Sequence, residues 1–137
     1  IEVPETFNNV SGSDSEEEVI EPISLILANG SFDAGQKIFK KCSACHTYKK
    51  EGANKVGPNL WNLINSPKAN VEGFAYSKEL AEFGGQWGYE ELALFLYKPK
   101  EYIKGTKMNF SGLKKVQDRA NLVLFLREQS DNPAPLP

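Results

Sequence analysis

The chain has 137 residues, of which 40% are hydrophobic and 25% charged, and its formal net charge is −2. This length suits one domain with appendages. No apolar run reaches the roughly 18 residues that a membrane-spanning helix needs, so we expect no transmembrane helix within this sequence, and no signal peptide is visible.

The charge is distributed unevenly along the chain. Residues 1–32 contain seven acidic residues and no basic one, whereas residues 33–137 contain 16 basic and 11 acidic residues. The stretch 11–18 is rich in charge and poor in hydrophobic residues, so it buries too little surface to offset its ordering entropy. We predict that residues 1–32 form an acidic flexible leader or membrane tether, in which the apolar stretch 20–27 is the part able to pack on the domain.

The first predicted helix begins at Ser31 or Asp33, either of which can cap it, and runs to about Cys42. Gly35 and Phe39 lie four residues apart on one face of this helix. A glycine inside a helix costs about 1 kcal/mol relative to alanine. The presence of Gly35 therefore indicates close contact with another helix.

The sequence Cys42-Ser43-Ala44-Cys45-His46 follows and contains both cysteines and the single histidine of the chain. C-x-x-C-H is the attachment signature of c-type haem, in which two thiols add to the porphyrin vinyl groups and the histidine ligates the iron. A thioredoxin-like redox pair would need a strand–helix–strand context, a structural zinc site needs about four Cys or His ligands, and the loop is too short for a good disulfide. We therefore predict one covalently attached haem c per chain.

Residues 47–75 lack helical periodicity and contain several Gly and Pro residues. Such a long irregular segment is unusual in a small domain, but it can wrap a large rigid ligand. Further helices are predicted at 76–83, 89–97 and 116–128, the last two with apolar residues at i, i+3 and i+4. No convincing strand is present, so the fold class is all-α. The Pro-rich tail, 130–137, is predicted to be frayed.

The single methionine, Met108, lies in Gly105-Thr106-Lys107-Met108, which predicts an extended loop that can cross the second face of a haem. A second histidine ligand is impossible because the chain has one histidine. Ligation by His and Met raises the reduction potential relative to more basic ligand pairs. It also fills both axial positions of the iron, which suits electron transfer better than binding of oxygen or peroxide. We hypothesise that His46 and Met108 are the metal ligands.

Seven segments share their order and spacing with a known family. They are Gly35-Gln-Lys-Ile-Phe39, Cys42-Ser-Ala-Cys-His46, Gly57-Pro-Asn-Leu60, Gly73-Phe-Ala-Tyr76, Trp87, Gly105-Thr-Lys-Met108 and Asn121-Leu-Val-Leu-Phe125-Leu. Together they resemble class I cytochrome c, above all the membrane-anchored bacterial cytochromes c whose haem domain is similar to mitochondrial cytochrome c. The resemblance implies the class I fold over residues 33–129, with three main helices, short helices and long loops around one haem.

The resemblance also implies roles for residues near the iron ligands. Pro58 would accept a hydrogen bond from the His46 ring nitrogen that is not on the iron, which fixes the ring and tunes its basicity. Thr106 would steady the loop that carries Met108. Both residues are therefore predicted to support ligation rather than to ligate the iron themselves.

Other implied roles concern the haem edge and the core. Tyr76 and Trp87 would hydrogen-bond a buried haem propionate, and Phe110 would cover the haem edge beside the methionine. Gly35 and Phe125 would lie where the first and last helices cross. From the residues alone, plain core filling would be the preferred interpretation of the three aromatic side chains.

Three positions depart from the mitochondrial pattern. Ser66 stands where that family has an arginine near a propionate, Leu80 where an asparagine binds a buried water, and Phe95 where a tyrosine approaches the methionine sulfur. Loss of the arginine charge should lower the reduction potential, because a cation favours the less positive ferrous state. Burial of more apolar surface should raise it. Because the two effects have opposite signs, we make no prediction of the net shift in potential.

The resemblance implies a mono-haem electron carrier, not an enzyme. We expect it to serve electron transport in a respiratory chain, between a quinol-oxidising cytochrome bc complex and a haem–copper cytochrome c oxidase. We also expect a monomer in the bacterial periplasm, tethered to the inner membrane by an anchor outside this sequence, with no nucleic-acid partner. Basic residues would steer docking onto acidic partner surfaces. The candidates are Lys40, Lys41, Lys55, Lys100, Lys104, Lys107, Lys114 and Lys115.

Two rival functions stay open. A small haem peroxidase would need an open iron site and a distal acid–base group, so Met108 would have to leave the iron. Alternatively, the chain is the haem domain of a larger oxidase or reductase subunit. Carbon monoxide binding to the reduced protein distinguishes the first rival, and the full-length gene product distinguishes the second.

Overall fold

The computed structural model describes residues 20–137, so most of the predicted acidic leader lies outside the described part. Within residues 20–137 the fold is helical, with one isolated bridge between Pro67 and Gln86 and no strand. The all-α fold class is confirmed. The elements in chain order are η1 (Leu27–Asn29), α2 (Phe32–Phe39), α3 (Lys78–Phe83), α4 (Tyr89–Tyr97), α5 (Pro99–Tyr102) and α6 (Val116–Arg127).

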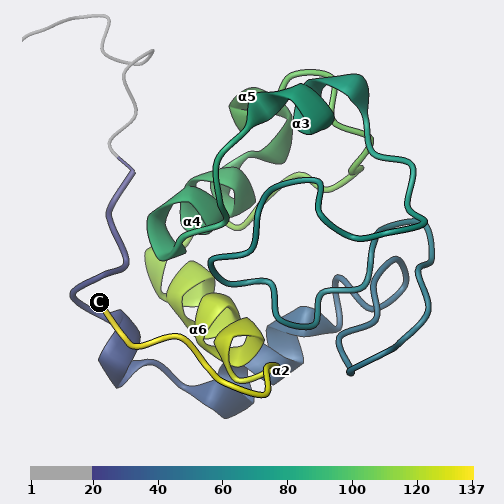
Figure 1. Cartoon of the computed structure of the whole chain (residues 1–137). Coiled ribbons are helices and arrows are strands. Elements are labelled where there is room, and N and C mark those ends of the chain that lie inside the picture. Colours follow the sequence, from purple (N-terminus) through teal and green to yellow (C-terminus); the bar gives the residue numbers. More distant parts are fainter. Residues whose placement is uncertain (1–19) are drawn as a thin grey trace, which may run out of the picture.

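Helices α2 and α6 cross in direct contact (Figure 1). Ser31 caps α2, because its Oγ accepts a hydrogen bond from the Ala34 backbone N–H at 3.0 Å. At the crossing, a Cβ atom on Gly35 would lie 2.0 Å from the Asn121 carbonyl oxygen. The prediction that Gly35 marks a close helix contact is therefore confirmed, and Phe125 packs beside it.

Helix α4 has the predicted bounds, and its apolar positions face the core. Leu92, Phe95 and Leu96 are all buried. Pro99 follows the end of α4 and occupies the first turn of α5, where a helix does not use the backbone N–H that proline lacks. Helix α3 begins two residues later than predicted and ends before Gly84, whose φ of 82° suits glycine.

Residues 20–30, here called the N-terminal strap, pack on the helices. Ile23 and Leu27 are fully buried. The Glu90 carboxylate of α4 accepts hydrogen bonds from the backbone N–H groups of Ile23 and Ser24, at 3.2 and 2.9 Å. Glu21 lies 3.6 Å from the buried guanidinium of Arg119 on α6. The apolar stretch noted in the sequence thus belongs to the packed structure, which extends N-terminally of residue 33.

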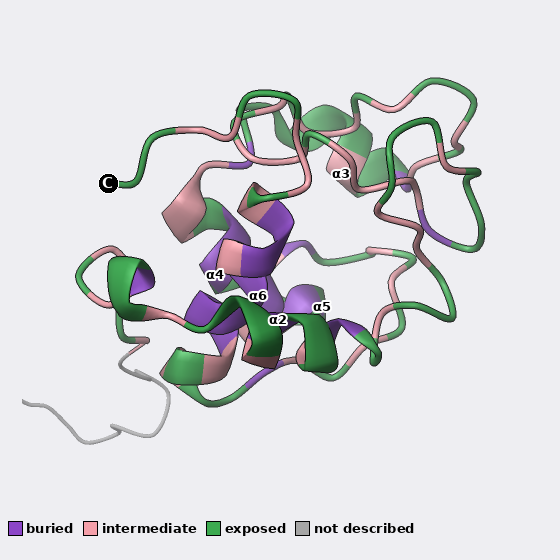
Figure 2. Cartoon of the chain, turned by 90° about the horizontal axis from the view of Figure 1, so that it is seen from below, coloured by how far each residue is buried: buried purple, intermediate pink, exposed green. Residues whose placement is uncertain are grey.

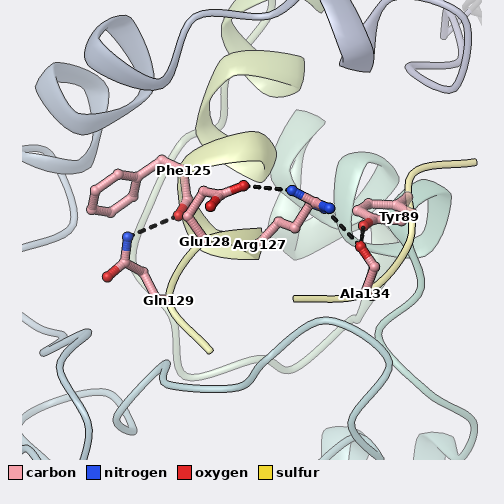
Figure 3. Close-up of polar contacts among 6 residues, drawn as sticks. All are labelled: Tyr89, Phe125, Arg127, Glu128, Gln129 and Ala134. Atoms are coloured by element: carbon pink, nitrogen blue, oxygen red, sulfur yellow. Dashed lines mark hydrogen bonds and ion pairs between the residues drawn. The ribbon is translucent and has the colours of Figure 1, made fainter. Parts of the chain in front are cut away.

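The tail is also held in place, as Figure 3 shows. The Ala134 carbonyl oxygen accepts hydrogen bonds from Tyr89 Oη at 3.1 Å and from Arg127 Nε at 2.7 Å. At the end of α6, Gln129 Nε2 donates to the Phe125 carbonyl oxygen at 3.1 Å. The prediction of a frayed tail is wrong for residues 130–134, because composition gave no sign of these tertiary partners.

Helices α4 and α6 contain most of the buried helical residues, whereas α2 buries only Gly35 and Phe39 and the long connections are mostly intermediate or exposed (Figure 2). Helices α2, α4 and α6 form what is here called the helical layer. The connections at residues 40–77 and 103–115, here called the loop layer, lie against it (Figure 1). Within residues 20–137, no helix combines the length and hydropathy needed to cross a membrane. Because the loop layer lies against the helical layer, the space between the two layers is the place to look for a functional site.

Candidate haem-binding site

A cavity of about 220 Å³ opens between the helical layer and the loop layer. Its wall is mostly apolar, with contributions from α2, α4 and α6. Every predicted cofactor-contact residue lines it. These residues are Cys42, Cys45, His46, Pro58, Tyr76, Trp87, Thr106, Met108 and Phe110.

The two cysteines lie in a turn that follows directly from α2. The backbone N–H of Cys42 donates to the Phe39 carbonyl at 2.7 Å, and those of Cys45 and His46 donate to the Cys42 carbonyl at 3.0 and 2.9 Å. Both thiols are free, with Cys42 partly buried and Cys45 exposed. Burial, and secondarily the neighbouring Cys45, raises the pKa of the Cys42 thiol to about 11. This turn presents two thiols and one imidazole to the same cavity.

The His46 ring is held in one orientation. Its Nδ1 lies 2.7 Å from the Pro58 carbonyl oxygen, which can only accept, so Nδ1 carries the proton and donates. A Cβ atom on Gly57 would lie 2.3 Å from His46 Cε1, so only glycine leaves room for the ring. Burial lowers the pKa of His46 against the opposing effect of the Pro58 hydrogen bond. Burial thus favours the neutral ring, and with the proton on Nδ1 the other nitrogen, Nε2, is the one able to bind a metal.

Met108 reaches the cavity from the loop between α5 and α6. Its backbone N–H donates to Thr106 Oγ1 at 3.2 Å. Gly105, with φ of 84°, turns the chain just before these residues. Lys107 Nζ donates to the Ala75 carbonyl at 3.0 Å and so ties this segment to the other part of the loop layer. The thioether thus faces the same cavity as the His46 imidazole.

Tyr76 and Trp87 lie in the wall with defined partners. Tyr76 Oη accepts a hydrogen bond from the Val71 backbone N–H at 2.9 Å, and burial raises the pKa of this phenol. Trp87 is 7% exposed and packs on Phe95, with ring centroids 5.1 Å apart. An apolar wall with two thiols, one oriented imidazole and one thioether is a donor set that fits a covalently attached haem.

The three positions that depart from the mitochondrial pattern, Ser66, Leu80 and Phe95, all line this cavity. Ser66 Oγ donates to the Leu63 carbonyl at 2.6 Å, so the hydroxyl is used within its own turn. Phe95 is buried, and Leu80 packs against the core cluster. The wall is thus more apolar at these positions than the pattern implies.

Sequence reasoning missed Lys68, whose ammonium group lies 4.9 Å from the centre of the Trp87 ring, just behind the cavity wall. No motif marks this lysine, and its neighbours come from a segment about 20 residues further along the chain. Among the predicted docking lysines, Lys41 and Lys107 line the cavity. Lys55 Nζ donates to the Ser43 carbonyl at 2.9 Å, beside the attachment turn.

Comparisons with known proteins agree with this geometry. The family model described as cytochrome c matches residues 32–130. A cytochrome c homolog of Rickettsia felis is 39% identical over 127 residues, which cover 93% of this chain and 72% of that protein. Cytochrome c of Gossypium barbadense is 45% identical over 102 residues, or 74% of this chain and 92% of that protein.

A solved structure is also similar. Cytochrome cH from Methylobacterium extorquens matches with a TM-score of 0.68 and 31% sequence identity, over 72% of this chain and 99% of that one. The chain spans between 60% and 72% of the length of its Rickettsia relatives. The likeness thus covers the helical layer, the loop layer and the cavity between them.

Proposed function

Because the chain belongs to the cytochrome c family, we propose that it carries single electrons from a quinol-oxidising cytochrome bc complex to a haem–copper cytochrome c oxidase. Its fold is that of class I cytochrome c, as the sequence predicted. It is a mono-haem electron carrier rather than an enzyme, and it binds one haem c through Cys42 and Cys45. The ligand set, the partners and the location of the protein are the proposed part.

The observation that carries the ligand assignment is the common cavity of His46 and Met108. When bound, the haem supplies an iron that takes up or releases one electron. His46 Nε2 would ligate this iron, because Nδ1 is engaged with the Pro58 carbonyl at 2.7 Å. Met108 would supply the second ligand from a loop that Thr106 steadies. With both positions held by the protein, little would reorganise on electron transfer.

The ligand assignment is tested on the ferric holoprotein at neutral pH. We expect the weak red-edge absorption band that arises from sulfur-to-iron charge transfer, and we expect M108A to lose this band while it keeps its covalent haem. M108A should also bind carbon monoxide readily once reduced, whereas the wild type should resist it. A wild-type protein without the band, or with rapid and full carbon monoxide binding, would contradict the assignment and favour an open iron site.

Partner docking would use the basic residues around the cavity mouth. Lys41 and Lys107 are exposed and line the cavity, and Lys55 lies beside the attachment turn. Residues 33–137 carry five more basic than acidic groups, which would steer the domain onto acidic partner surfaces and speed association at low salt. The orientation would bring the attachment turn, rather than the strap, towards the partner.

The docking proposal is tested by the rate of electron transfer to an oxidase as a function of ionic strength. We expect the rate to fall as salt rises, and we expect K41E/K107E to slow it strongly at low salt. K37E is the matched control, because Lys37 is exposed on α2 and does not line the cavity. Insensitivity of the rate to salt would overturn the docking proposal without affecting the ligand assignment.

The proposed location is the bacterial periplasm, with the acidic segment that precedes the strap, residues 1–19, as a tether to the inner membrane. The support is compositional, since residues 1–19 contain six acidic and no basic residues. A tether would replace a three-dimensional search by a local one at high effective concentration. The complete precursor sequence and membrane fractionation of the native protein test this proposal, and recovery of the full-length protein free of membranes would contradict it.

A further inference from the structure

Lys68 lies in a short antiparallel pairing of backbone segments, between residues 66–68 and residues 85–87. The isolated bridge joins Pro67 to Gln86. Next to it, the Lys68 backbone N–H donates to the Gly85 carbonyl, and the Trp87 N–H donates to the Ser66 carbonyl, each at 2.9 Å. The backbone pairing therefore fixes the position of the Lys68 Cα relative to Trp87, and so brings the lysine side chain within reach of the indole.

The ammonium group of Lys68 lies over two aromatic rings. Its Nζ is 4.9 Å from the centre of the Trp87 ring and 5.2 Å from that of Phe83, both within the range of a cation–π interaction. The same Nζ donates to the Gln86 carbonyl at 3.0 Å. In the part of the chain that the structure describes, no carboxylate pairs with Lys68. Its positive charge is therefore directed at the ring and is not cancelled by a neighbouring anion.

Trp87 connects this charge to the cavity. The indole is 7% exposed and lines the cavity, whereas Lys68 is half-buried and lies outside the lining. Lys41 and Lys107, which do line the cavity, are exposed to solvent. A half-buried charge is screened less by water and salt than an exposed one. Lys68 is thus placed to act on the cavity through its wall.

We propose that Lys68 is a positioning residue that acts through Trp87 to favour the reduced haem and so raises its reduction potential. The inference rests on the proposed function, since it requires a haem in the cavity beside Trp87. A cation close to the wall favours the oxidation state with the lower positive charge. It also draws electron density from the indole, which makes Nε1–H a stronger donor to an anionic group in the cavity.

A purely structural role makes a different prediction. The aliphatic stem of Lys68 covers the Phe83 and Trp87 rings, and this contact alone could stabilise the fold. K68M keeps such a stem and removes the charge, K68R keeps the charge over the rings, and K68A removes both. A structural role follows the stem, whereas an effect on the potential follows the charge.

The test is the midpoint potential of the holoprotein, measured by spectroelectrochemistry and paired with thermal unfolding. We expect K68M and K68A to shift the potential to more negative values, lowering the ratio of reduced to oxidised protein at a fixed applied potential by about threefold or more. K68R should keep the wild-type potential. K37M, which removes an exposed charge on α2, should leave it unchanged, and the K68M shift should persist from about 20 to about 500 mM salt.

The outcomes separate this inference from the proposed function. If K68M keeps the wild-type potential while its covalent haem and red-edge band are intact, the role of Lys68 is overturned and the proposed function stands. A shift in K68A but not in K68M would equally overturn it, since only the stem would matter. A wild-type protein without covalent haem would overturn the proposed function and this inference together.

Discussion

The helical layer and the loop layer are built on different principles. In the helical layer, α2 and α6 meet through backbone contact at Gly35, and Ile23 and Leu27 of the N-terminal strap complete the core. In the loop layer, four non-glycine residues adopt positive φ, and apolar side chains face a cavity of about 220 Å³. These four are Glu51, Asn62, Asn65 and Ala69. The helical layer satisfies its own packing, whereas the loop layer is shaped around a group that the polypeptide does not supply.

This difference predicts how the two layers depend on the haem. The largest effect is expected from C42S/C45S, which prevents covalent attachment. A void of about 220 Å³, at about 24 cal/mol per Å³, would cost about 5 kcal/mol, close to the whole stability of a small domain. We therefore expect the loop layer to lose its fixed structure, whereas any residual protection stays in α2 and α6. Hydrogen exchange measured by mass spectrometry checks this, and equal protection of the loop layer in variant and holoprotein would contradict it.

The next largest effect is expected at the helix crossing. In G35A, the added Cβ would lie 2.0 Å from the Asn121 carbonyl oxygen and 2.9 Å from Phe125 Cβ, so the helices must separate. We expect a loss of about 3 kcal/mol in unfolding free energy. The control is G73A, where a Cβ would meet only Asn54 Nδ2, at 3.9 Å, but φ is 79°. That variant should lose about 1–2 kcal/mol through backbone strain alone, so a smaller loss in G35A than in G73A would refute close packing as the cause.

The sequence was sufficient wherever one local pattern decides the structure. Apolar spacing predicted the helices at 89–97 and 116–128, and Gly35 predicted the crossing. The C-x-x-C-H motif and the single methionine identified side chains that line one cavity in the structure. These features depend on short-range periodicity or on chemistry that few residue types can perform.

The sequence was insufficient where a contact joins two distant and ordinary residues. Glu90 holds the strap from 66 residues away along the chain, and Ala134 is held through its backbone carbonyl, which carries no sequence signal. Lys68 reaches Trp87 only because a two-residue bridge aligns their segments. Composition predicted a frayed tail for the same reason, since three prolines indicate irregular structure but do not reveal its partners.

A smaller effect should show whether the strap belongs to the helical layer. E90A removes the acceptor for the backbone N–H groups of Ile23 and Ser24. Because these donors are partly buried, we expect a loss of about 1–3 kcal/mol in unfolding free energy and faster exchange of the strap amides. The control is E101A, since Glu101 is exposed and its carboxylate lies 3.6 Å from Lys98 Nζ, and such a surface pair is worth about 0–1 kcal/mol. Unchanged strap exchange in E90A would place the strap outside the helical layer.

The smallest effect is expected where the tail meets the helical layer. Burial raises the pKa of Tyr89 above its ordinary value of 10.0, and its phenol donates to the Ala134 carbonyl. A raised pKa means that this contribution is complete below about pH 10 and is lost as the pH rises through the folded-state value. The phenolate cannot donate, so residues 130–134 should become more accessible to a carboxypeptidase above about pH 10.

The comparison variant for the tail is Y89F, which lacks the hydroxyl at every pH. In Y89F the tail should be more accessible to the carboxypeptidase already at neutral pH. Raising the pH above about 10 should therefore increase tail accessibility more in the wild type than in Y89F. Tyr76 and Tyr102, whose pKa values are also raised by burial, are common to both proteins and cancel in the difference. The expected loss is under about 1 kcal/mol, because the phenol is only partly buried and Arg127 also donates to the same carbonyl. If wild type and Y89F respond identically across this range, the Tyr89 hydroxyl does not help to hold the tail, and this prediction is wrong.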